Sequence, residues 1–246
     1  MTLLLLAAGF ATRLGDKFSG KPKHLLPAGE RLMIDWVLQF LSPADKYFSK
    51  KVLIANEVSY PMFLDWRKNS GNLDIEILRN GVRKKEERLG AVGDFLLALK
   101  LGKIEDDILV CAADYALKDF DFVGWIKEFK KKKTSMIIAA PEEEVEVLRA
   151  GSCIEFDKSG QVTAFEEKPK KPFSKFYGAP YYLIKKEDTK IIKKIPRDLR
   201  DNMGQIVEKL LSDSQVFCQI HKGKILHLTS EKDLEELNKR RAAVPS

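Results

Sequence analysis

Residues 1–27 read MTLLLLAAGFATRLGDKFSGKPKHLLP, and no other segment says more about the architecture of this chain. The apolar run from Leu3 to Leu6 predicts a buried first strand, and Ala7-Ala8-Gly9 predicts a loop of small residues after it. Because these residues have little side chain, a ligand can approach the backbone closely. Arg13 and Lys23 then bring two cations to the same rim. Backbone N–H groups with Arg and Lys at the end of a first strand suit a polyphosphate.

Two common phosphate-binding loops do not fit this segment. A dinucleotide fingerprint needs G-x-G-x-x-G, and a P-loop needs G-x-x-x-x-G-K-[ST]. The glycines here are Gly9 and Gly15, with Asp16 following, so neither spacing is met.

The segment resembles the signature of the sugar-phosphate nucleotidylyltransferases, L-A-A-G-x-G-T-R-L followed by P-K-x-L-L-P. Residues 6–14 and 22–27 match these two strings, except that Ala11 stands where the family usually has glycine. The resemblance implies catalytic roles for Arg13 and Lys23. It also implies that the nucleotide is bound by Leu6, Ala8, Gly9, Arg13, Lys23, Leu89 and Gly90.

The composition fits one domain over residues 1–246. Hydrophobic residues make up 44% of the chain, which argues against general disorder, and no apolar run approaches the ~20 residues of a membrane span. The N-terminal run is too short for a secretory signal. The three cysteines, Cys111, Cys153 and Cys218, are odd in number and far apart, so they indicate neither a disulfide framework nor a metal site. We expect a cytoplasmic protein.

The net charge of +7 is the difference between 43 basic and 36 acidic residues. Its densest run, KEFKKKK over residues 127–133, is typical of the solvated C-terminal end of a helix. No aromatic and basic ribbon accompanies it, so we expect no nucleic-acid partner.

Strand and helix patterns alternate along the chain. The apolar spacing predicts strands at residues 3–6, 52–55, 73–78, 108–112 and 135–140, and helices at 32–41, 60–66, 89–99 and 120–129. Residues 152–156 and 162–165 predict a β-hairpin, and a strand at 181–184, two helices, a β segment at 216–228 and a helix at 232–241 follow. The prediction is a Rossmann-like, three-layer α/β/α fold with a mostly parallel central sheet plus the hairpin.

Asp114 is the first charge after the apolar run Ile108 to Ala113. A carboxylate at the carboxyl end of a central strand suits Mg²⁺ held between protein and phosphates, although an Asp there also commonly caps a loop. In the resembled family an aspartate here binds the catalytic metal, which implies a catalytic, substrate-binding and metal-binding role for Asp114.

The string Glu166-Glu167-Lys168-Pro169 follows the hairpin. The family carries E-K-P at this place and uses its Glu and Lys on the sugar and the sugar's phosphate, which implies that Glu167 and Lys168 bind substrate. A carboxylate accepts hydrogen bonds from the hydroxyl groups of a sugar, and an ammonium group neutralises the charge of a phosphate. Gly151 and Gly178 also match family glycines near the sugar pocket.

One departure affects the metal site. The family has D-x-G-T-x-x-D-L near its C-terminus, and its first Asp is a second metal ligand. His227 takes that place here, with Thr229 in place of the glycine. Two interpretations stay open: His227 is a ligand, which favours Mn²⁺ or Co²⁺ over Mg²⁺, or it is a packed strand residue and Asp114 holds the metal with the phosphates.

The resemblance implies an enzyme that joins an NTP and a sugar-1-phosphate to give an NDP-sugar and pyrophosphate. There are two alternatives: a catalytically inactive regulatory module that binds a nucleotide or sugar nucleotide, and a nucleotidyltransferase for a non-sugar phosphate. The expected partners are these two substrates, without nucleic acid or membrane. The nucleobase, the sugar and the oligomeric state, a homo-oligomer included, are left open by the sequence.

Overall fold

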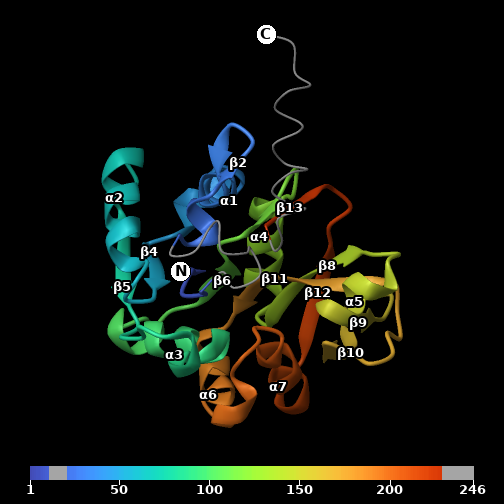
Figure 1. Cartoon of the computed structure of the whole chain (residues 1–246). Coiled ribbons are helices and arrows are strands. Elements are labelled where there is room, and N and C mark those ends of the chain that lie inside the picture. The colour runs from blue at the N-terminus through green and yellow to red at the C-terminus, as the bar shows by residue number, and fades with distance from the viewer. Residues whose placement is uncertain (11–20, 229–246) are drawn as a thin grey trace.

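The computed structural model describes residues 1–10 and 21–228. Their central feature is a seven-stranded sheet (Figure 1). Its strands lie in the order β12 (Val216–Ile220), β8 (Ser135–Pro141), β11 (Phe176–Ile184), β6 (Ile108–Ala112), β1 (Thr2–Leu6), β4 (Lys50–Ala55) and β5 (Ile75–Arg79). Neighbours pair in parallel except that β11 runs antiparallel to both β6 and β8. The prediction of a mostly parallel sheet is confirmed.

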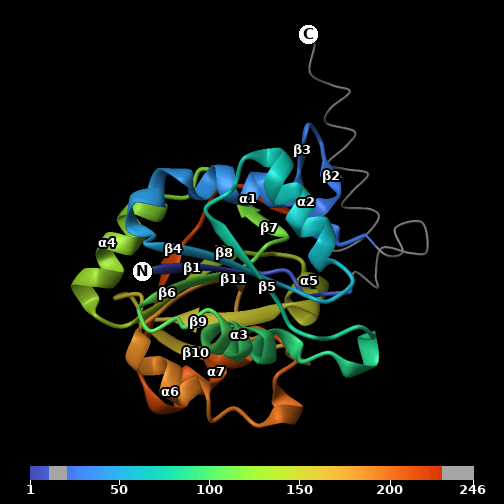
Figure 2. The same ribbon diagram turned by 90° about the vertical axis from the view of Figure 1, so that its left-hand side faces the viewer.

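Helices cover both faces of this sheet, as Figures 1 and 2 show. One face carries α1 (Met33–Leu41), α2 (Tyr60–Ser70) and α4 (Phe122–Lys132), and the other carries α3 (Gly90–Leu101), α6 (Thr189–Ile192) and α7 (Gln205–Asp213). Strand β1 is buried on both sides because Leu3 and Leu5 enter one core cluster while Leu4 and Leu6 enter the other. The chain therefore has the three-layer α/β/α architecture that its sequence predicts.

Smaller elements complete the fold. Strands β9 (Ser152–Phe156) and β10 (Val162–Glu167) form the expected antiparallel hairpin, preceded by α5 (Val145–Ala150). Two short antiparallel pairs join β2 (Pro27–Ala28) to β3 (Arg31–Leu32) and β7 (Tyr115–Leu117) to β13 (Ile225–His227). Short 3-10 helices occupy Lys23–Leu25, Ser42–Tyr47, Lys85–Glu87, Lys186–Asp188 and Arg197–Leu199.

The element boundaries differ most from the sequence predictions in the second half of the chain. The β segment at 216–228 is two strands in different sheets, because residues 221–224 leave the central sheet before β13 pairs with β7. Strand β11 begins at Phe176 rather than residue 181 and contains Pro180. Strand β10 runs through Glu167, so that Lys168 is the first residue after it. The helix predicted at 232–241 lies outside the described residues.

Candidate active site

A cavity of about 360 Å³ lies at the carboxyl ends of the parallel strands. Residues that directly follow β1 and β6, the first turn of α3, and the segment before α7 contribute to its wall. The lining residues are Leu6, Ala8, Gly9, Phe10, Lys23, His24, Lys85, Arg88, Gly90, Ala91, Asp94, Ala112, Asp114, Lys168, Asp201, Asn202 and Met203. This is the edge of a parallel α/β sheet at which ligands bind.

Lys23 and Asp114 form an ion pair in this cavity. Lys23 begins the short 3-10 turn after the opening loop, and Asp114 lies between β6 and β7. Burial by itself would raise the pKa of Asp114, but Lys23 and His24 outweigh it and hold that pKa below its ordinary value. The carboxylate is therefore ionised at neutral pH and directed at a cation.

His24 is fully enclosed next to this pair. Burial lowers the pKa of His24 to about 4, with Asp114 opposing the shift and Lys23 adding to it, so the imidazole is neutral at pH 7. Its ring lies 6.0 Å from that of Phe63, and its Nδ1 has no hydrogen-bond partner among the described residues. No role was predicted for His24, because it occupies a variable position between two motif residues.

Lys168 enters the cavity from the hairpin side. Its backbone has φ +53°, a left-handed conformation that residues with a side chain adopt rarely and often at functional sites. A hydrogen bond from its N–H to the carbonyl of Gly151, 2.7 Å long, holds this turn. The Lys168 ammonium donates to Oδ1 of Asn202 at 2.6 Å. Hydrogen bonds thus hold both the backbone of Lys168 and its ammonium group in place.

The amino end of α3 is held against the segment 200–201. The N–H groups of Ala91 and Val92 donate to the carbonyls of Asp201 and Arg200, so the free donors at this helix start are satisfied by a neighbouring loop. Gly90 has φ +76°, and a Cβ there would lie 2.2 Å from the Arg200 carbonyl oxygen. Glycine is required at this position for both reasons.

Several residues expected at the site lie apart from the cavity lining. Gly151 and Gly178 permit close packing: a Cβ would lie 2.5 Å from the Tyr177 ring in the first case and from the Phe165 ring in the second. The Glu167 carboxylate packs on Gly204, where a Cβ would lie 1.9 Å from Oε2. Leu89 is the residue before α3. The predicted substrate contacts of these residues stay predictions, and Arg13 lies outside the described residues.

A family model described as "Nucleotidyl transferase" matches residues 2–225. The chain belongs to the nucleotidyl transferase family.

Known proteins similar to this nucleotidyl transferase carry related names. It is 26% identical over 242 residues, 97% of the chain, to a putative mannose-1-phosphate guanyltransferase of Sulfolobus acidocaldarius. It is also 26% identical over 207 residues, 74% of the chain, to a valienol-1-phosphate guanylyltransferase of Streptomyces hygroscopicus subsp. limoneus. The matched regions cover 62% and 54% of these two relatives, so the chain spans under two thirds of their length.

Solved structures share the fold. A putative glucose-1-phosphate thymidylyltransferase from Bacillus anthracis matches with a TM-score of 0.83 at 19% identity, covering 100% of this chain and 97% of that one. A UDP-glucose pyrophosphorylase complexed with UDP-glucose matches with a TM-score of 0.81 at 16% identity, covering 98% of both chains. At these identities the likeness concerns the fold alone.

His227 lies in β13 of this transferase, opposite Tyr115 of β7. The two rings stack with centroids 5.5 Å apart, and the next residue, Leu228, donates its N–H to the Asp114 carbonyl at 3.2 Å. His227 is therefore beside the backbone of Asp114 but is not among the residues that line the cavity. Within residues 1–10 and 21–228, no group of three or more His, Cys, Asp or Glu side chains could hold a metal.

Six charged or polar residues of the cavity were not predicted from the sequence: His24, Lys85, Arg88, Asp94, Asp201 and Asn202. Asp201 pairs with Arg88 at 2.8 Å across 113 positions of the sequence. No short-range pattern reveals such a pair. The spacing of Asp94 from Gly90 does carry a signal, because residues four apart lie on the same face of a helix and Gly90 was predicted to bind the nucleotide.

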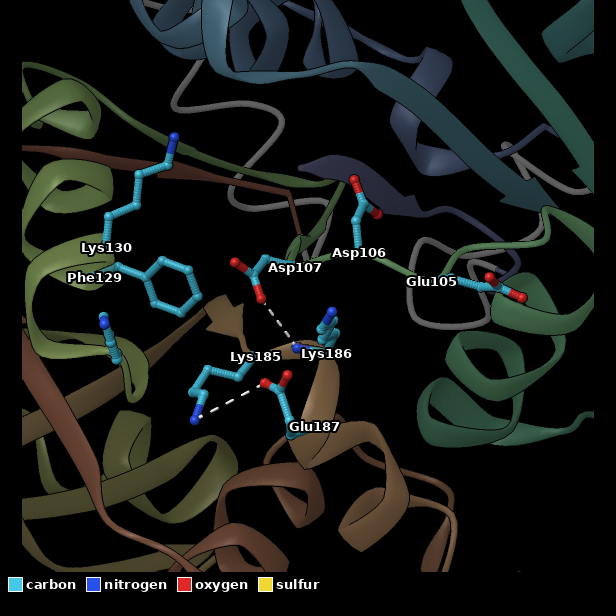
Figure 3. Close-up of a pocket in the computed structure, with 9 residues that line it drawn as sticks. Glu105, Asp106, Asp107, Phe129, Lys130, Lys185, Lys186 and Glu187 are labelled. Atoms are coloured by element: carbon cyan, nitrogen blue, oxygen red, sulfur yellow. Dashed lines mark hydrogen bonds and ion pairs between the residues drawn. The ribbon is translucent and has the colours of Figure 1, made fainter.

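A second cavity of about 550 Å³ lies elsewhere, beside the amino end of β6 and the carboxyl end of β11 (Figure 3). It is larger, but four acids and four lysines share its wall, so their charges cancel. Its lining residues are Glu105, Asp106, Asp107, Phe129, Lys130, Lys133, Lys185, Lys186 and Glu187. The pairs drawn there join Lys185 to Glu187 and the backbone of Lys186 to Asp107. None of the predicted site residues lies in this cavity. In the part of the chain that the structure describes, no helix is long and apolar enough to cross a membrane.

Proposed function

We propose that this nucleotidyl transferase joins an NTP to a sugar-1-phosphate or a closely related cyclitol phosphate. The observation that carries the proposal is the single cavity wall that holds Lys23, Asp114 and Lys168 at the carboxyl edge of the sheet. Two cations and a carboxylate suit two phosphate-bearing substrates and a divalent cation. The names of the two curated relatives, one for mannose-1-phosphate and one for valienol-1-phosphate, support this acceptor class and a guanine nucleotide donor.

The reaction is a direct displacement. An oxygen of the acceptor phosphate attacks the nucleotide α-phosphorus, a new P–O bond forms, and the bond to the bridging β-phosphate oxygen breaks to release pyrophosphate. The attacking phosphate is already ionised near pH 7, so no general base is needed. Catalysis then depends on positioning and on neutralising charge.

Each side chain has a part in this scheme. Lys23 neutralises charge at the α-phosphate, and Lys168, fixed by Asn202, orients the acceptor phosphate. Arg13 is assigned to the triphosphate by its motif. The neutral His24 fills the space behind Lys23 without adding charge.

Mg²⁺ fits the donor chemistry of this cavity, because Asp114 presents a buried, ionised carboxylate oxygen next to a phosphate-binding lysine. Asp114 would hold the ion, and the bound ion would neutralise the phosphates during transfer. Mn²⁺ or Co²⁺ replaces it as the better ion if His227 is a second ligand.

A pyrophosphate-release assay tests the proposal, with GTP, ATP, UTP and dTTP each combined with a panel of hexose-1-phosphates and one non-sugar phosphate. We expect release only when an NTP, a divalent cation and a sugar phosphate are all present. Nucleotide binding without turnover for any acceptor would instead support the regulatory module, and turnover with the non-sugar phosphate alone would move the acceptor to another class.

A further inference from the structure

Asp94 is a buried carboxylate on the wall of the active-site cavity. Only 8% of the residue is exposed, and it faces the cavity from α3, one turn after Gly90. Its Oδ1 accepts a hydrogen bond from Nδ2 of Asn80 at 2.8 Å, and Oδ1 of Asn80 accepts in turn from the N–H of Val82 at 2.9 Å. This chain of bonds fixes which way the Asn80 amide and the Asp94 carboxylate point.

The second oxygen of Asp94, Oδ2, has no hydrogen-bond partner among residues 1–10 and 21–228, and no described cation pairs with this carboxylate. Burial raises the pKa of Asp94 to about 6, and the Asn80 hydrogen bond only partly opposes this. Because Asp94 lines the cavity, this oxygen is left to accept hydrogen bonds from a ligand that supplies N–H or O–H donors.

The position of Asp94 favours a part of the nucleotide other than the phosphates as its ligand. Asp114 and its partner Lys23 lie at the end of β6, whereas Asn80 directly follows β5, and β1 and β4 separate these two strands in the sheet. A polyphosphate is attracted to Lys23 and repelled by an uncompensated carboxylate. The part of the nucleotide next to Asp94 is therefore the uncharged end, with its base.

We propose that Asp94 selects guanine as the nucleobase of the donor. This inference rests on the proposed function and assigns the base preference to one side chain. Guanine presents two adjacent donors, N1–H and the 2-amino group, to a single acceptor. Uracil and thymine present one N–H between two carbonyl oxygens, which a carboxylate repels. Leu6, Ala8 and Ala91 supply small apolar surface on the same wall for the flat base.

The substitution Asp94→Asn tests this assignment because the geometry dictates its outcome. Nδ2 of Asn80 continues to attract an oxygen, so the new amide keeps its oxygen toward Asn80 and directs its NH₂ group into the cavity. This NH₂ group faces the 2-amino group of guanine donor to donor, which is unfavourable, but it can donate a hydrogen bond to the 2-carbonyl oxygen of xanthine. We expect kcat/KM for GTP to fall about 10- to 100-fold and the value for XTP to rise by a similar factor.

Asp201→Asn is the matched control, because it changes another carboxylate of the same cavity into an amide. Asp201 is exposed and paired with Arg88, so its substitution should leave the ratio of GTP to XTP unchanged, whatever it does to the total rate. Circular dichroism and thermal unfolding establish that both variants are folded.

Four outcomes separate the possibilities. Reversal of the GTP and XTP preference in Asp94→Asn alone supports the assignment. An equal loss for every nucleotide, with GTP and dGTP no longer distinguished, would place Asp94 on the ribose and overturn it. Wild-type protein that transfers from UTP or dTTP in preference to GTP would also overturn it while leaving the proposed function intact, whereas no transfer from any NTP would defeat the proposed function itself.

Discussion

At the scale of single residues, the most informative contact is the ion pair of Lys23 with Asp114. The Asp114 side chain is 6% exposed and that of Lys23 is 23% exposed, and among the described residues Lys23 is the cation that pairs with this carboxylate. In the proposed reaction, a nucleotide with its divalent cation would offer both partners a replacement: phosphate for Lys23 and metal for Asp114. Lys23 and Asp114 thus balance each other's charge within the cavity.

Lys23→Ala removes the cation from this arrangement. We expect kcat to fall roughly 10²–10³-fold, the typical loss for one preorganised charge-stabilising group. Pyrophosphate release under saturating substrates measures it. Lys21→Ala is the control: Lys21 is exposed two positions earlier on the same segment, and its loss should change kcat little. Equal losses in both variants would reduce Lys23 to a contributor of general positive charge.

Glu167 predicts a pH dependence of stability. Burial raises its pKa to about 7, with Lys168 opposing and Glu208 adding to the shift. Between pH 4.5 and 7 the native state binds more protons at Glu167 than the unfolded chain does, so the free energy of unfolding falls as the pH rises through this window. The shift corresponds to at most about 3 kcal/mol.

Glu167→Gln should therefore be more stable than the wild type at pH 8 and equally stable at pH 4. Urea unfolding at several pH values measures the difference. Glu166→Gln is the control, because Glu166 is exposed and a surface change typically stays within about 0.5 kcal/mol. A difference between Glu167→Gln and wild type that does not vary with pH would contradict this explanation.

At the scale of elements, the sequence predicts the bounds of those strands and helices whose apolar residues repeat regularly. Strands β1, β6 and β8 and helix α1 lie within one residue of their predicted bounds, since their apolar residues repeat with the period of a buried strand or of one helix face. The pairing of β7 with β13 was not predicted, because its strands are three residues long and join segments 110 positions apart along the chain.

The candidate site divides in the same way. Lys23, Asp114 and Lys168 were predicted, because each directly follows or precedes a strand or motif whose end is readable. Asp94, Asp201 and Asn202 reach the cavity through tertiary contacts, such as the α3 N–H groups on the carbonyls of residues 200 and 201. Such contacts depend on how elements pack, which local pattern does not specify.

The junction between α3 and residues 200–201 yields a prediction at this scale. Alanine at position 90 would have an unfavourable φ of +76°, and its Cβ would clash with the Arg200 carbonyl. The substitution Gly90→Ala must therefore displace the neighbouring segment, whose residues Asp201 and Asn202 line the cavity. We expect clear destabilisation together with a raised KM for the nucleotide and the acceptor. The assay combines thermal unfolding with steady-state kinetics.

Gly71→Ala provides the comparison. Gly71 has nearly the same φ of +75°, but a Cβ there would have no atom within 4 Å. This variant should cost only the backbone strain, about 1–2 kcal/mol, with normal KM values. If the two variants lost stability equally and both kept normal kinetics, the contact with residues 200–201 would have no part in shaping the site.

At the scale of the whole molecule, the two core clusters share one sheet. Leu4 and Leu5 are adjacent in β1, both are fully buried, and they belong to opposite clusters. Neither face can lose its packing without exposing the strands that support the other. The single domain that the sequence predicts over residues 1–246 should therefore unfold in one cooperative transition.

The tryptophans make this testable, since all three of the chain, Trp36, Trp66 and Trp125, pack on the Leu5 side of the sheet. Their fluorescence reports that side directly, whereas far-ultraviolet circular dichroism reports the whole backbone. Leu4→Ala removes packing from the opposite side and should cost about 2–5 kcal/mol. If the sheet couples the faces, the fluorescence transition shifts as far as the dichroism transition does, and Leu5→Ala produces the same agreement. A fluorescence midpoint that stays at the wild-type temperature in Leu4→Ala would show that the two layers unfold separately.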